Sequence, residues 1–363
     1  MKEKIEEALR NVNHPAKGTD IVSAQVLQNI EIVGNKIILT MNYGKANDPF
    51  ANSIKKSVVK ILEPVVGSQY IVEFAEVNNR KPLLPEYYTL KEVKNIIAVS
   101  SGKGGVGKST VASNLAIALS HTGAKVALLD ADVYGPSAPK MFGEENFRPV
   151  MIEKDGKEYI ESLQKYNIGV QSIGFFVSPG EATIWRGPMA SNALKQVITQ
   201  TWWGELDFLV LDMPPGTGDI HLTIVQELPV TGVIVVSTPQ NVALADAIKG
   251  ISMFRSDKIN VPVLGLVENM AWFTPAELPD NKYYIFGKDG CKKLAESLEL
   301  PLLGQIPIVQ SICEDGDNGT PSAMNPFTPQ GKAFAELAEA VIAQVEIRNK
   351  TLPPTKKVEV TQK

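Results

Sequence analysis

The fold is decided by residues 100–110, which read Ser100-Ser101-Gly102-Lys103-Gly104-Gly105-Val106-Gly107-Lys108-Ser109-Thr110. A short apolar run at residues 96–99 precedes this stretch, and a segment with apolar residues at helical spacing follows it from Val111. A strand, a glycine-rich turn and a helix in this order are the context of a phosphate-binding loop, and the residues fit the pattern G-x-x-x-x-G-K-[S/T]. Because glycine carries no Cβ, backbone N–H groups of such a loop can approach phosphate oxygens closely. The stretch therefore predicts a nucleotide site rather than a glycine-rich turn without a ligand.

The side chains of this loop suit a nucleotide with bound magnesium. The helix expected to begin at about Lys108 would point the positive end of its dipole at a phosphate. Lys108 would reach the β- and γ-phosphates of ATP, and the Ser109 hydroxyl would ligate Mg²⁺. The residues predicted to bind the nucleotide are Gly102, Lys103, Gly104, Gly105, Val106, Gly107, Lys108, Ser109 and Thr110.

A second lysine, Lys103, lies inside the same loop. One interpretation is an ordinary solvated lysine. The other is a catalytic cation that reaches the phosphates of a nucleotide in a neighbouring subunit. The pattern K-G-G-x-G-K-[S/T] resembles the deviant phosphate loop of the MinD, ParA and nitrogenase iron-protein class, which dimerises around two nucleotides. That resemblance implies a homodimer in which Lys103 acts in trans.

Two aspartates, Asp130 and Asp132, end the next apolar run and are followed by Gly135-Pro136-Ser137. An aspartate at a strand end can cap a helix or form a turn. Because side chains alternate along a strand, residues two apart share one face of the sheet. Asp132 is therefore predicted to orient the attacking water or to lie beside Mg²⁺, and the turn after it would be a first switch that responds to the γ-phosphate.

The run at residues 207–211 is apolar after its first residue and ends in Asp212. An apolar strand that ends in aspartate is the Walker-B pattern, in which the carboxylate holds Mg²⁺ through a water. The following residues, Met213-Pro214-Pro215-Gly216-Thr217-Gly218-Asp219, combine stiff and permissive backbone, as expected of a second switch. The alternative is a proline-rich turn after a core strand.

Two later strand ends are candidates for contact with the adenine base. Asn269 lies in Glu268-Asn269-Met270, and Pro307 lies in Ile306-Pro307-Ile308. The amide of Asn269 could hydrogen-bond to the edge of the base, and the backbone at Pro307 could pack on the ring. The alternative for Asn269 is a turn former.

Composition excludes several classes of function. Of the 363 residues, 44% are hydrophobic and 21% are charged, with a formal net charge of −4, which is ordinary for a globular protein and disfavours nucleic acid as a partner. No run of about 20 apolar residues exists to span a membrane. The charged N-terminal segment lacks the apolar core of a signal peptide, so a cytoplasmic protein is expected. The two cysteines cannot form a disulfide framework.

The fold class predicted is α/β: a doubly wound, mostly parallel sheet preceded by a small α+β domain. The sheet is expected from strand-like runs at 96–101, 125–130, 207–212, 232–238, 261–268 and 302–306. The expected domains are a small α+β domain at 1–77, a polar linker at 78–94, the P-loop domain at 95–345 and a disordered tail at 346–363.

These motifs together resemble the Mrp/ApbC-type P-loop ATPases, which carry iron–sulfur clusters to apoproteins. The resemblance rests on the phosphate loop, Asp130-Ala131-Asp132, Tyr134-Gly135-Pro136-Ser137, Trp185-Arg186-Gly187-Pro188-Met189, the stretch from Asp212 to Asp219, Glu268-Asn269-Met270 and Ile285-Phe286-Gly287. It covers most of residues 95–345. The α-β-β-α-β order expected for residues 1–77 resembles the small domain that accompanies iron–sulfur assembly ATPases. Residues 45–49, where that domain often carries a reactive cysteine, contain none, so a docking or structural role is expected for it.

The resemblance implies Mg²⁺-dependent ATP hydrolysis in a homodimer, with an iron–sulfur cluster bridging the subunits and apoproteins or assembly proteins as partners. It assigns catalysis to Lys103, Lys108 and Asp132, and magnesium to Ser109 and Asp212. The chain departs from the family pattern in one place. The family has a C-x-x-C pair between its E-N-M and I-F-G elements, but residues 271–284 contain no cysteine, and Pro275 and Leu278 stand at about the two ligand positions. The iron–sulfur ligands are therefore unknown, because Cys291 and Cys313 do not have the spacing of a chelating pair.

Two functions remain open at this point. The first is an ATP-hydrolysing iron–sulfur cluster carrier or assembly factor. The second is a nucleotide-dependent dimer switch or adaptor of the same fold that holds no stable cluster, with apolar residues of 272–279 as a docking surface. A MinD-type membrane switch fits less well, because the tail with Pro353-Pro354 has no apolar stripe.

Overall fold

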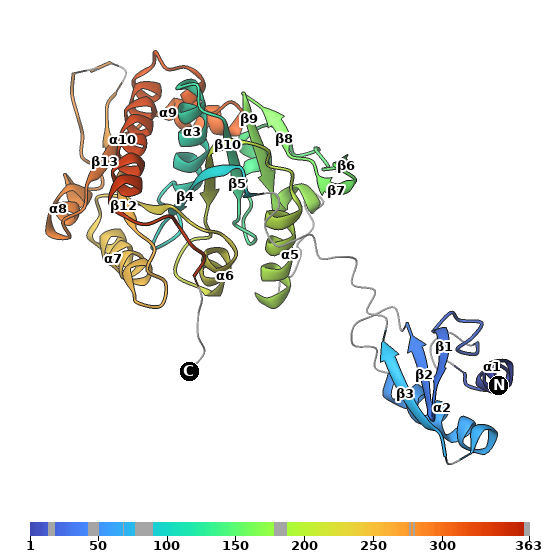
Figure 1. The fold of residues 1–363 in the computed structure, drawn as a ribbon. Coiled ribbons are helices and arrows are strands. Elements are labelled where there is room, and N and C mark those ends of the chain that lie inside the picture. Colours follow the sequence, from blue (N-terminus) through green and yellow to red (C-terminus); the bar gives the residue numbers. More distant parts are fainter. Residues whose placement is uncertain are drawn as a thin grey trace. The chain divides into compact units, whose positions relative to one another are not determined.

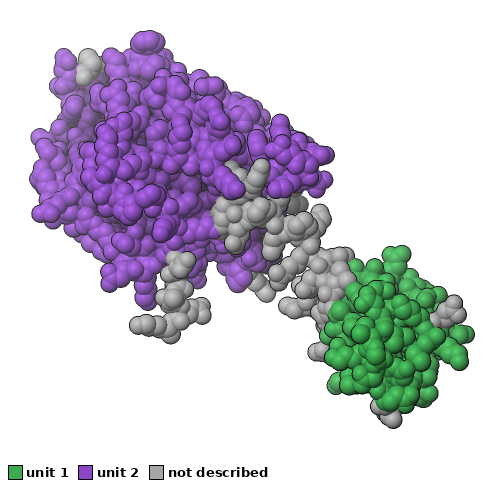
Figure 2. Space-filling model, in the orientation of Figure 1, with its two compact units in different colours: residues 1–86 green, residues 87–363 purple. Residues whose placement is uncertain are grey.

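The computed structural model describes residues 1–13, 19–42, 51–67, 69–76, 90–177, 187–275, 277–278 and 280–358 of the chain. The chain forms two compact units, Met1–Glu86 and Tyr87–Lys363 (Figure 2). Several residues for which the sequence makes predictions lie outside the described residues: 45–49, residues 78–89 of the expected linker, 185–186, 276, 279, and residues 359–363 of the expected tail.

The first unit is a small α+β fold. Helices α1 (Lys2–Leu9) and α2 (Ala51–Val66) accompany a sheet of β1 (Leu27–Val33), β2 (Lys36–Met41) and β3 (Ile71–Glu76). Strand β2 lies in the middle, antiparallel to β1 and parallel to β3. Both helices and the sheet contribute to one core, whose buried members include Ile5, Leu9, Ile37, Leu39, Ile54 and Val58.

The second unit is built on an eight-stranded sheet in the order β13-β12-β11-β4-β10-β5-β9-β8. Its strands are β4 (Val93–Ser100), β5 (Val126–Asp130), β8 (Leu163–Lys165), β9 (Ile168–Ser172), β10 (Leu206–Asp212), β11 (Gly232–Ser237), β12 (Val263–Phe273) and β13 (Leu302–Ile308). Every pairing is parallel except that between β8 and β9. The predicted doubly wound, mostly parallel sheet is confirmed.

Helices cover both faces of this sheet (Figure 1). Helices α3 (Lys108–His121) and α10 (Pro329–Thr351) share one core with alternate residues of β4, Ile97 and Val99. The other residues of β4, Ile96 and Ala98, belong to the opposite core. That second core includes α5 (Gly187–Gln200), α6 (Asp219–Glu227), α7 (Asn241–Arg255) and α8 (Gly290–Ser297). A strand that is buried on both faces needs apolar residues at every position, which explains why its sequence is a continuous apolar run.

An excursion between β5 and α5 was not expected from the sequence. It contains the short helix α4 (Ala138–Met141), a hairpin of β6 (Met151–Lys154) and β7 (Lys157–Ile160), the strands β8 and β9, and the 3-10 helix η2 (Ile173–Phe176). Near the C-terminus, α9 (Gln310–Asp317) and η3 (Ser322–Met324) precede α10. Several of these strands have only three to five residues, too short for a periodic apolar signal.

The predicted disordered tail is wrong for residues 346–358. Helix α10 runs to Thr351, and its face remains buried at Val345 and Arg348. Beyond the helix, the Val358 N–H donates to the Val225 carbonyl (3.1 Å), and Val358 packs against the second core. Apolar contacts therefore continue past the point where the sequence becomes rich in charge and proline. The part of the chain that the structure describes contains no helix long and apolar enough to cross a membrane.

Candidate functional site

The phosphate loop joins the end of β4 to the start of α3, as its sequence predicts. Gly107 is the N-cap of α3 and has a left-handed backbone (φ 78°), and Gly105 has φ 80°. Residues other than glycine rarely adopt this backbone conformation, so the two positions favour glycine. The loop thus directs the amino end of a 14-residue helix towards the position where an anion would lie.

The loop packs directly on the backbone of α7. A Cβ atom added at Gly102 would lie 2.1 Å from both the backbone carbon and the carbonyl oxygen of Asp246. Backbone atoms of a helix cannot move aside as the end of a flexible side chain can. Gly102 therefore allows close approach between the start of the loop and α7, in addition to any contact with phosphate.

Replacing Gly102 by alanine is expected to lower the free energy of unfolding by at least about 2 kcal/mol, because the new methyl group forces the loop away from α7. Urea unfolding of the nucleotide-free protein measures this. Gly104 is the matched control, because an added Cβ there meets no described atom within 4 Å. Gly104→Ala should change stability by less than about 0.5 kcal/mol. Equal losses in the two variants would contradict the packing argument.

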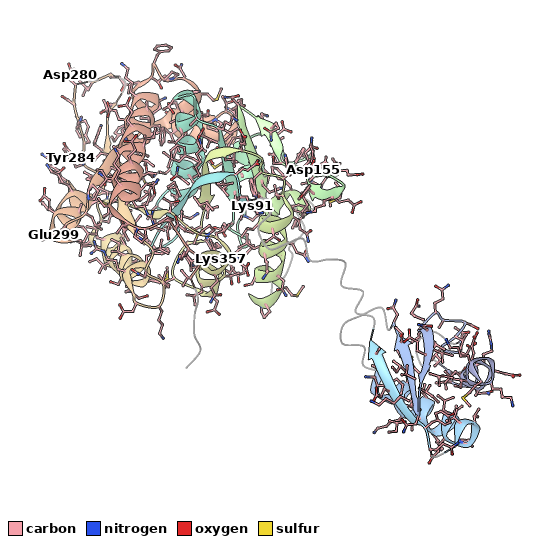
Figure 3. The ribbon with its side chains drawn as sticks, viewed as in Figure 1. Lys91, Asp155, Asp280, Tyr284, Glu299 and Lys357 are labelled. Carbon is pink, nitrogen blue, oxygen red and sulfur yellow. The ribbon has the colours of Figure 1, made fainter. Side chains whose placement is uncertain are left out.

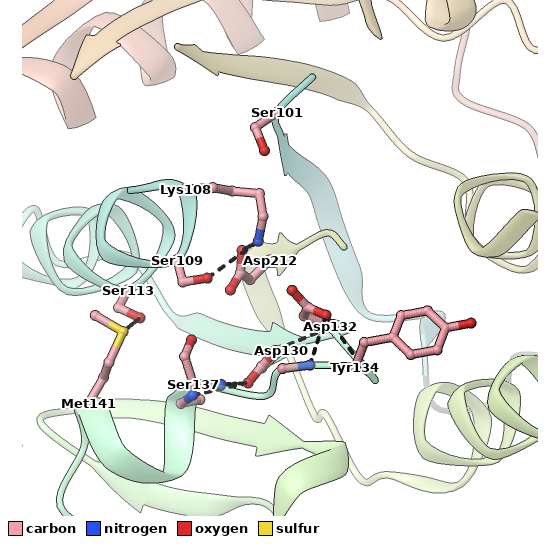
Figure 4. A network of polar contacts seen from close by, with 12 residues as sticks. Ser101, Lys108, Ser109, Ser113, Asp130, Asp132, Tyr134, Ser137, Met141 and Asp212 are labelled. Carbon is pink, nitrogen blue, oxygen red and sulfur yellow. Dashed lines mark hydrogen bonds and ion pairs between the residues drawn. The ribbon is translucent and has the colours of Figure 1, made fainter. Parts of the chain in front are cut away.

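Lys108, Ser109 and Asp212 come together from α3 and β10 (Figure 4). The Lys108 ammonium donates to Asp212 Oδ1 and lies 3.3 Å from Ser109 Oγ. The Lys108 and Asp212 side chains are only 6% and 3% exposed. Burial raises the pKa of Asp212, and the charge and hydrogen bond of Lys108 oppose that rise. The residue predicted to hold phosphate and the residue predicted to hold magnesium are thus partners in this buried pair.

The two aspartates at the end of β5 have different surroundings. Asp130 accepts four hydrogen bonds: from Asp132 N (3.1 Å), Ser137 N (2.9 Å), Ala138 N (3.0 Å) and Ser172 Oγ (3.0 Å). It thereby caps the amino end of α4, which is the structural role that the sequence left open. Burial, and next the charge of Asp212, raise the pKa of Asp130.

Asp132 accepts fewer hydrogen bonds than Asp130. Its Oδ1 accepts from the N–H groups of Tyr134 (3.3 Å) and Gly135 (3.2 Å), and no described residue hydrogen-bonds to Oδ2. Its charge also raises the pKa of Asp212, so the two carboxyls lie near each other (Figure 4). One carboxylate oxygen of Asp132 is thus available beside the Lys108–Asp212 pair.

The second predicted switch is attached to the phosphate loop. The Gly216 N–H donates to the Ser101 carbonyl (3.0 Å), and the Met213 N–H donates to the Val99 carbonyl (3.0 Å). His221, in the first turn of α6 just after this segment, was not singled out from the sequence. It is 1% exposed, neither ring nitrogen has a hydrogen-bond partner among the described residues, and burial lowers its pKa. Its closeness to the Asp212–Asp219 stretch was the only signal in the sequence.

The structure brings Asn269 to the phosphate loop. Its side-chain amide donates to the Val106 carbonyl (2.8 Å) from within β12, so it does not form a turn. Pro307 is buried within β13. Contact of either residue with a base remains a prediction. Lys103 is partly exposed, and its ammonium has no partner among the residues described, so its role in trans also remains a prediction.

In the segment that lacks the C-x-x-C pair, residues 272–275, 277–278 and 280–283 are described, and we call them the hairpin. Phe273 and Tyr283 pair through two N–H···O bonds of 2.8 Å, and the Lys282 ammonium lies 3.7 Å from the centre of the Trp272 ring. Figure 3 shows Asp280 at the far end of this hairpin and Tyr284 near its base.

The two cysteines do not form the C-x-x-C pair that the hairpin lacks. Cys291 is fully buried at the start of α8, and burial, followed by the nearby charge of Glu268, raises the pKa of its thiol to about 12. Cys313 is exposed on α9. No group of three or more histidine, cysteine or acidic side chains within the described ranges is arranged to hold a metal ion.

The part of the chain that carries this site matches a known protein family. The family described as NUBPL iron-transfer P-loop NTPase matches residues 92–342. The chain belongs to this family. The family described as iron–sulfur cluster assembly protein matches residues 2–71. The chain is therefore a P-loop NTPase preceded by an iron–sulfur-assembly-type domain, as the sequence motifs indicated.

Named relatives extend over most of the chain. An iron–sulfur cluster carrier protein of Haemophilus influenzae is 40% identical over 96% of this chain and 94% of its own length. One of Escherichia coli K12 is 51% identical over 72% of this chain and 69% of its own length. Among solved structures, a nucleotide-binding protein from Archaeoglobus fulgidus in complex with ADP is 35% identical, with a TM-score of 0.56, and the match covers 67% of this chain and 92% of that chain.

Proposed function

We propose that this protein is an ATP-hydrolysing iron–sulfur cluster carrier or assembly factor. The observation that carries the proposal is the convergence of Lys108, Ser109, Asp132 and Asp212 at the carboxyl ends of β5 and β10, beside a phosphate loop. This is where ligands bind in open parallel sheets. The carrier function is taken from the named relatives, of which the Haemophilus influenzae protein is similar to this chain over both of its units.

The donor set suits Mg²⁺. The ion prefers hard oxygen ligands, and Ser109 Oγ and the Asp212 carboxylate are of this kind. Bound with ATP, the ion would neutralise charge on the phosphates. Lys108 would exchange its contact with Asp212 for the β- and γ-phosphates, and this exchange would leave the Asp212 carboxylate free for a water or ion.

The remaining residues of the site take the roles that their surroundings permit. Asp132 would orient the attacking water through Oδ2. Lys103 would contribute positive charge across the interface of a homodimer. Asn269 donates to the Val106 carbonyl, so we expect it to act on the nucleotide by holding the loop rather than through the adenine base. Pro307 would contact the base from β13.

The hairpin favours a second candidate function. Soft thiolates are the ligands of iron–sulfur clusters, and the residues present at 272–283 do not fit such a group. The second candidate is therefore a nucleotide-dependent dimer switch or adaptor that acts with apoproteins or assembly proteins without holding a stable cluster.

Anaerobic reconstitution with iron and sulfide separates the two. Retained iron with the visible absorbance of a cluster, after removal of unbound reagents, would support a carrier. The absence of both signals, in a protein that still hydrolyses ATP, would support the switch. Cys313→Ala and Cys291→Ala identify the ligands of any retained cluster. The burial and raised pKa of Cys291 lead us to expect that only the Cys313 variant would lose it.

A further inference from the structure

Strand β12 supports the phosphate loop from behind. The Asn269 amide donates to the Val106 carbonyl in a buried position, across 163 residues of sequence. A Cβ atom added at the next loop residue, Gly107, would lie 2.2 Å from Asn269 Nδ2. Asn269 thus fills the space that glycine leaves and fixes the carbonyl just before the start of α3.

The residue after Asn269 is strained. Met270 has φ 56°, a left-handed conformation that is uncommon for a residue with a side chain of this size. Pairing between β12 and β13 passes from Asn269↔Ile306 directly to Phe273↔Ile308, so β12 bulges between these two pairs. Strained residues of this kind persist where the surrounding structure holds them, and they gather at switches and ligand clamps.

The hairpin begins where the bulge ends. Trp272 lies under the Lys282 ammonium, and Phe273 makes the paired hydrogen bonds to Tyr283. On the other side of the bulge, just before Asn269, Glu268 is fully buried and accepts hydrogen bonds from Cys291 N (2.6 Å) and Gln305 Nε2 (2.7 Å). Strand β12 is therefore held by hydrogen bonds before Asn269. The bulge connects this part of the strand to the hairpin.

We propose that Asn269 is a positioning residue of the phosphate loop, and that the bulge at Met270 transmits the state of that loop to the hairpin. The proposal rests on the nucleotide binding proposed above. When phosphate draws the loop N–H groups towards itself, the Val106 carbonyl moves, and Asn269 follows because a buried amide without an acceptor is costly. The strained bulge at Met270 passes this movement on to the hairpin, and the surroundings of Trp272 change with it. This coupling needs no metal in the hairpin.

The first test separates support of the loop from contact with the base. We expect Asn269→Ala to weaken binding of ATP and of inorganic tripolyphosphate, which has no base, by the same factor of roughly ten. Asn269→Asp should behave alike, because an ionised carboxylate cannot donate to the Val106 carbonyl although it can accept from an adenine amino group. Thermal unfolding confirms that both variants are folded. A loss confined to ATP, or no loss, would overturn the positioning role.

The second test reads the hairpin directly through the fluorescence of Trp272, whose ring contacts the Lys282 ammonium. We expect a non-hydrolysable ATP analogue to shift this emission. Because the chain has four tryptophans, Trp272→Phe identifies the signal by abolishing it. Met270→Gly relieves the strain, so we expect the shift to fall by at least half while nucleotide affinity changes less than about twofold.

Glu299→Gly is the matched control, because Glu299 is also left-handed (φ 53°) but lies beyond α8, outside the bulge (Figure 3). In Glu299→Gly, the Trp272 emission should shift on binding of the ATP analogue as it does in the wild type. A wild-type protein that hydrolyses ATP without a Trp272 response, or an undiminished response in Met270→Gly, would overturn this inference alone. A folded wild-type protein that binds no nucleotide would overturn the proposed function and this inference together.

Discussion

Lys108→Ala is expected to lower the rate of ATP hydrolysis on the order of a thousandfold, because preorganised positive charge stabilises the transferring phosphoryl group in the transition state and contributes strongly to the rate of this reaction. The Lys108 ammonium lies buried beside Ser109 and Asp212, and we expect it to exchange its contact with Asp212 for the phosphates. Release of inorganic phosphate at saturating ATP and magnesium measures the effect. Hydrolysis at the wild-type rate would mean that the site is misassigned.

The variant also changes stability, and this must be separated from catalysis. Removing Lys108 leaves the Asp212 carboxylate buried without its cation, which typically costs about 3–5 kcal/mol. The double variant Lys108→Met with Asp212→Asn removes both charges. We expect it to recover most of the lost stability in urea unfolding and to remain inactive. Recovery of activity along with stability would show that Lys108 acts mainly on the fold.

The convergence of the predicted site residues could be predicted from the sequence, because the parts of the site are local. The strand, glycine turn and helix around Lys108 are contiguous, and Asp132 and Asp212 each end an apolar run that must lie in a parallel sheet. Strands of one parallel sheet end at the same edge, so convergence of these residues follows from topology alone.

What the sequence did not predict depends on contacts between distant segments. The sequence predicts a contact of Asn269 with the base, but it does not predict that the Asn269 amide donates to the Val106 carbonyl in the phosphate loop. The Asp130 carboxylate caps α4 with help from Ser172, which lies on a strand that the sequence did not reveal. The segment that ends at Val358 is likewise ordered by its contact with α6, and its composition gives no sign of this. Local composition cannot anticipate such pairings, because each needs the complete fold.

Asp132→Asn is expected to lower hydrolysis by about a hundredfold to a thousandfold while ATP affinity changes only a few-fold, because a carboxylate that orients or deprotonates water acts in the transition state rather than in binding. Asparagine has nearly the same shape, and its side-chain oxygen can still accept from the N–H groups of Tyr134 and Gly135. The turn after β5 should therefore keep its conformation. Phosphate release and nucleotide titration on the same preparation separate the rate from the affinity.

Asp130 provides the matched comparison, because it lies two residues before Asp132, at the end of β5, and its carboxylate is fully occupied by structural hydrogen bonds. Asp130→Asn must give up at least one of these acceptors, and it should lower the free energy of unfolding by about 1–3 kcal/mol. Asp132→Asn should leave stability within about 0.5 kcal/mol of the wild type. If the Asp132 variant hydrolyses ATP normally, the free oxygen beside Asp212 has no role in the reaction. If it loses stability as the Asp130 variant does, the two aspartates share a structural role, and the attacking water must be oriented by another group.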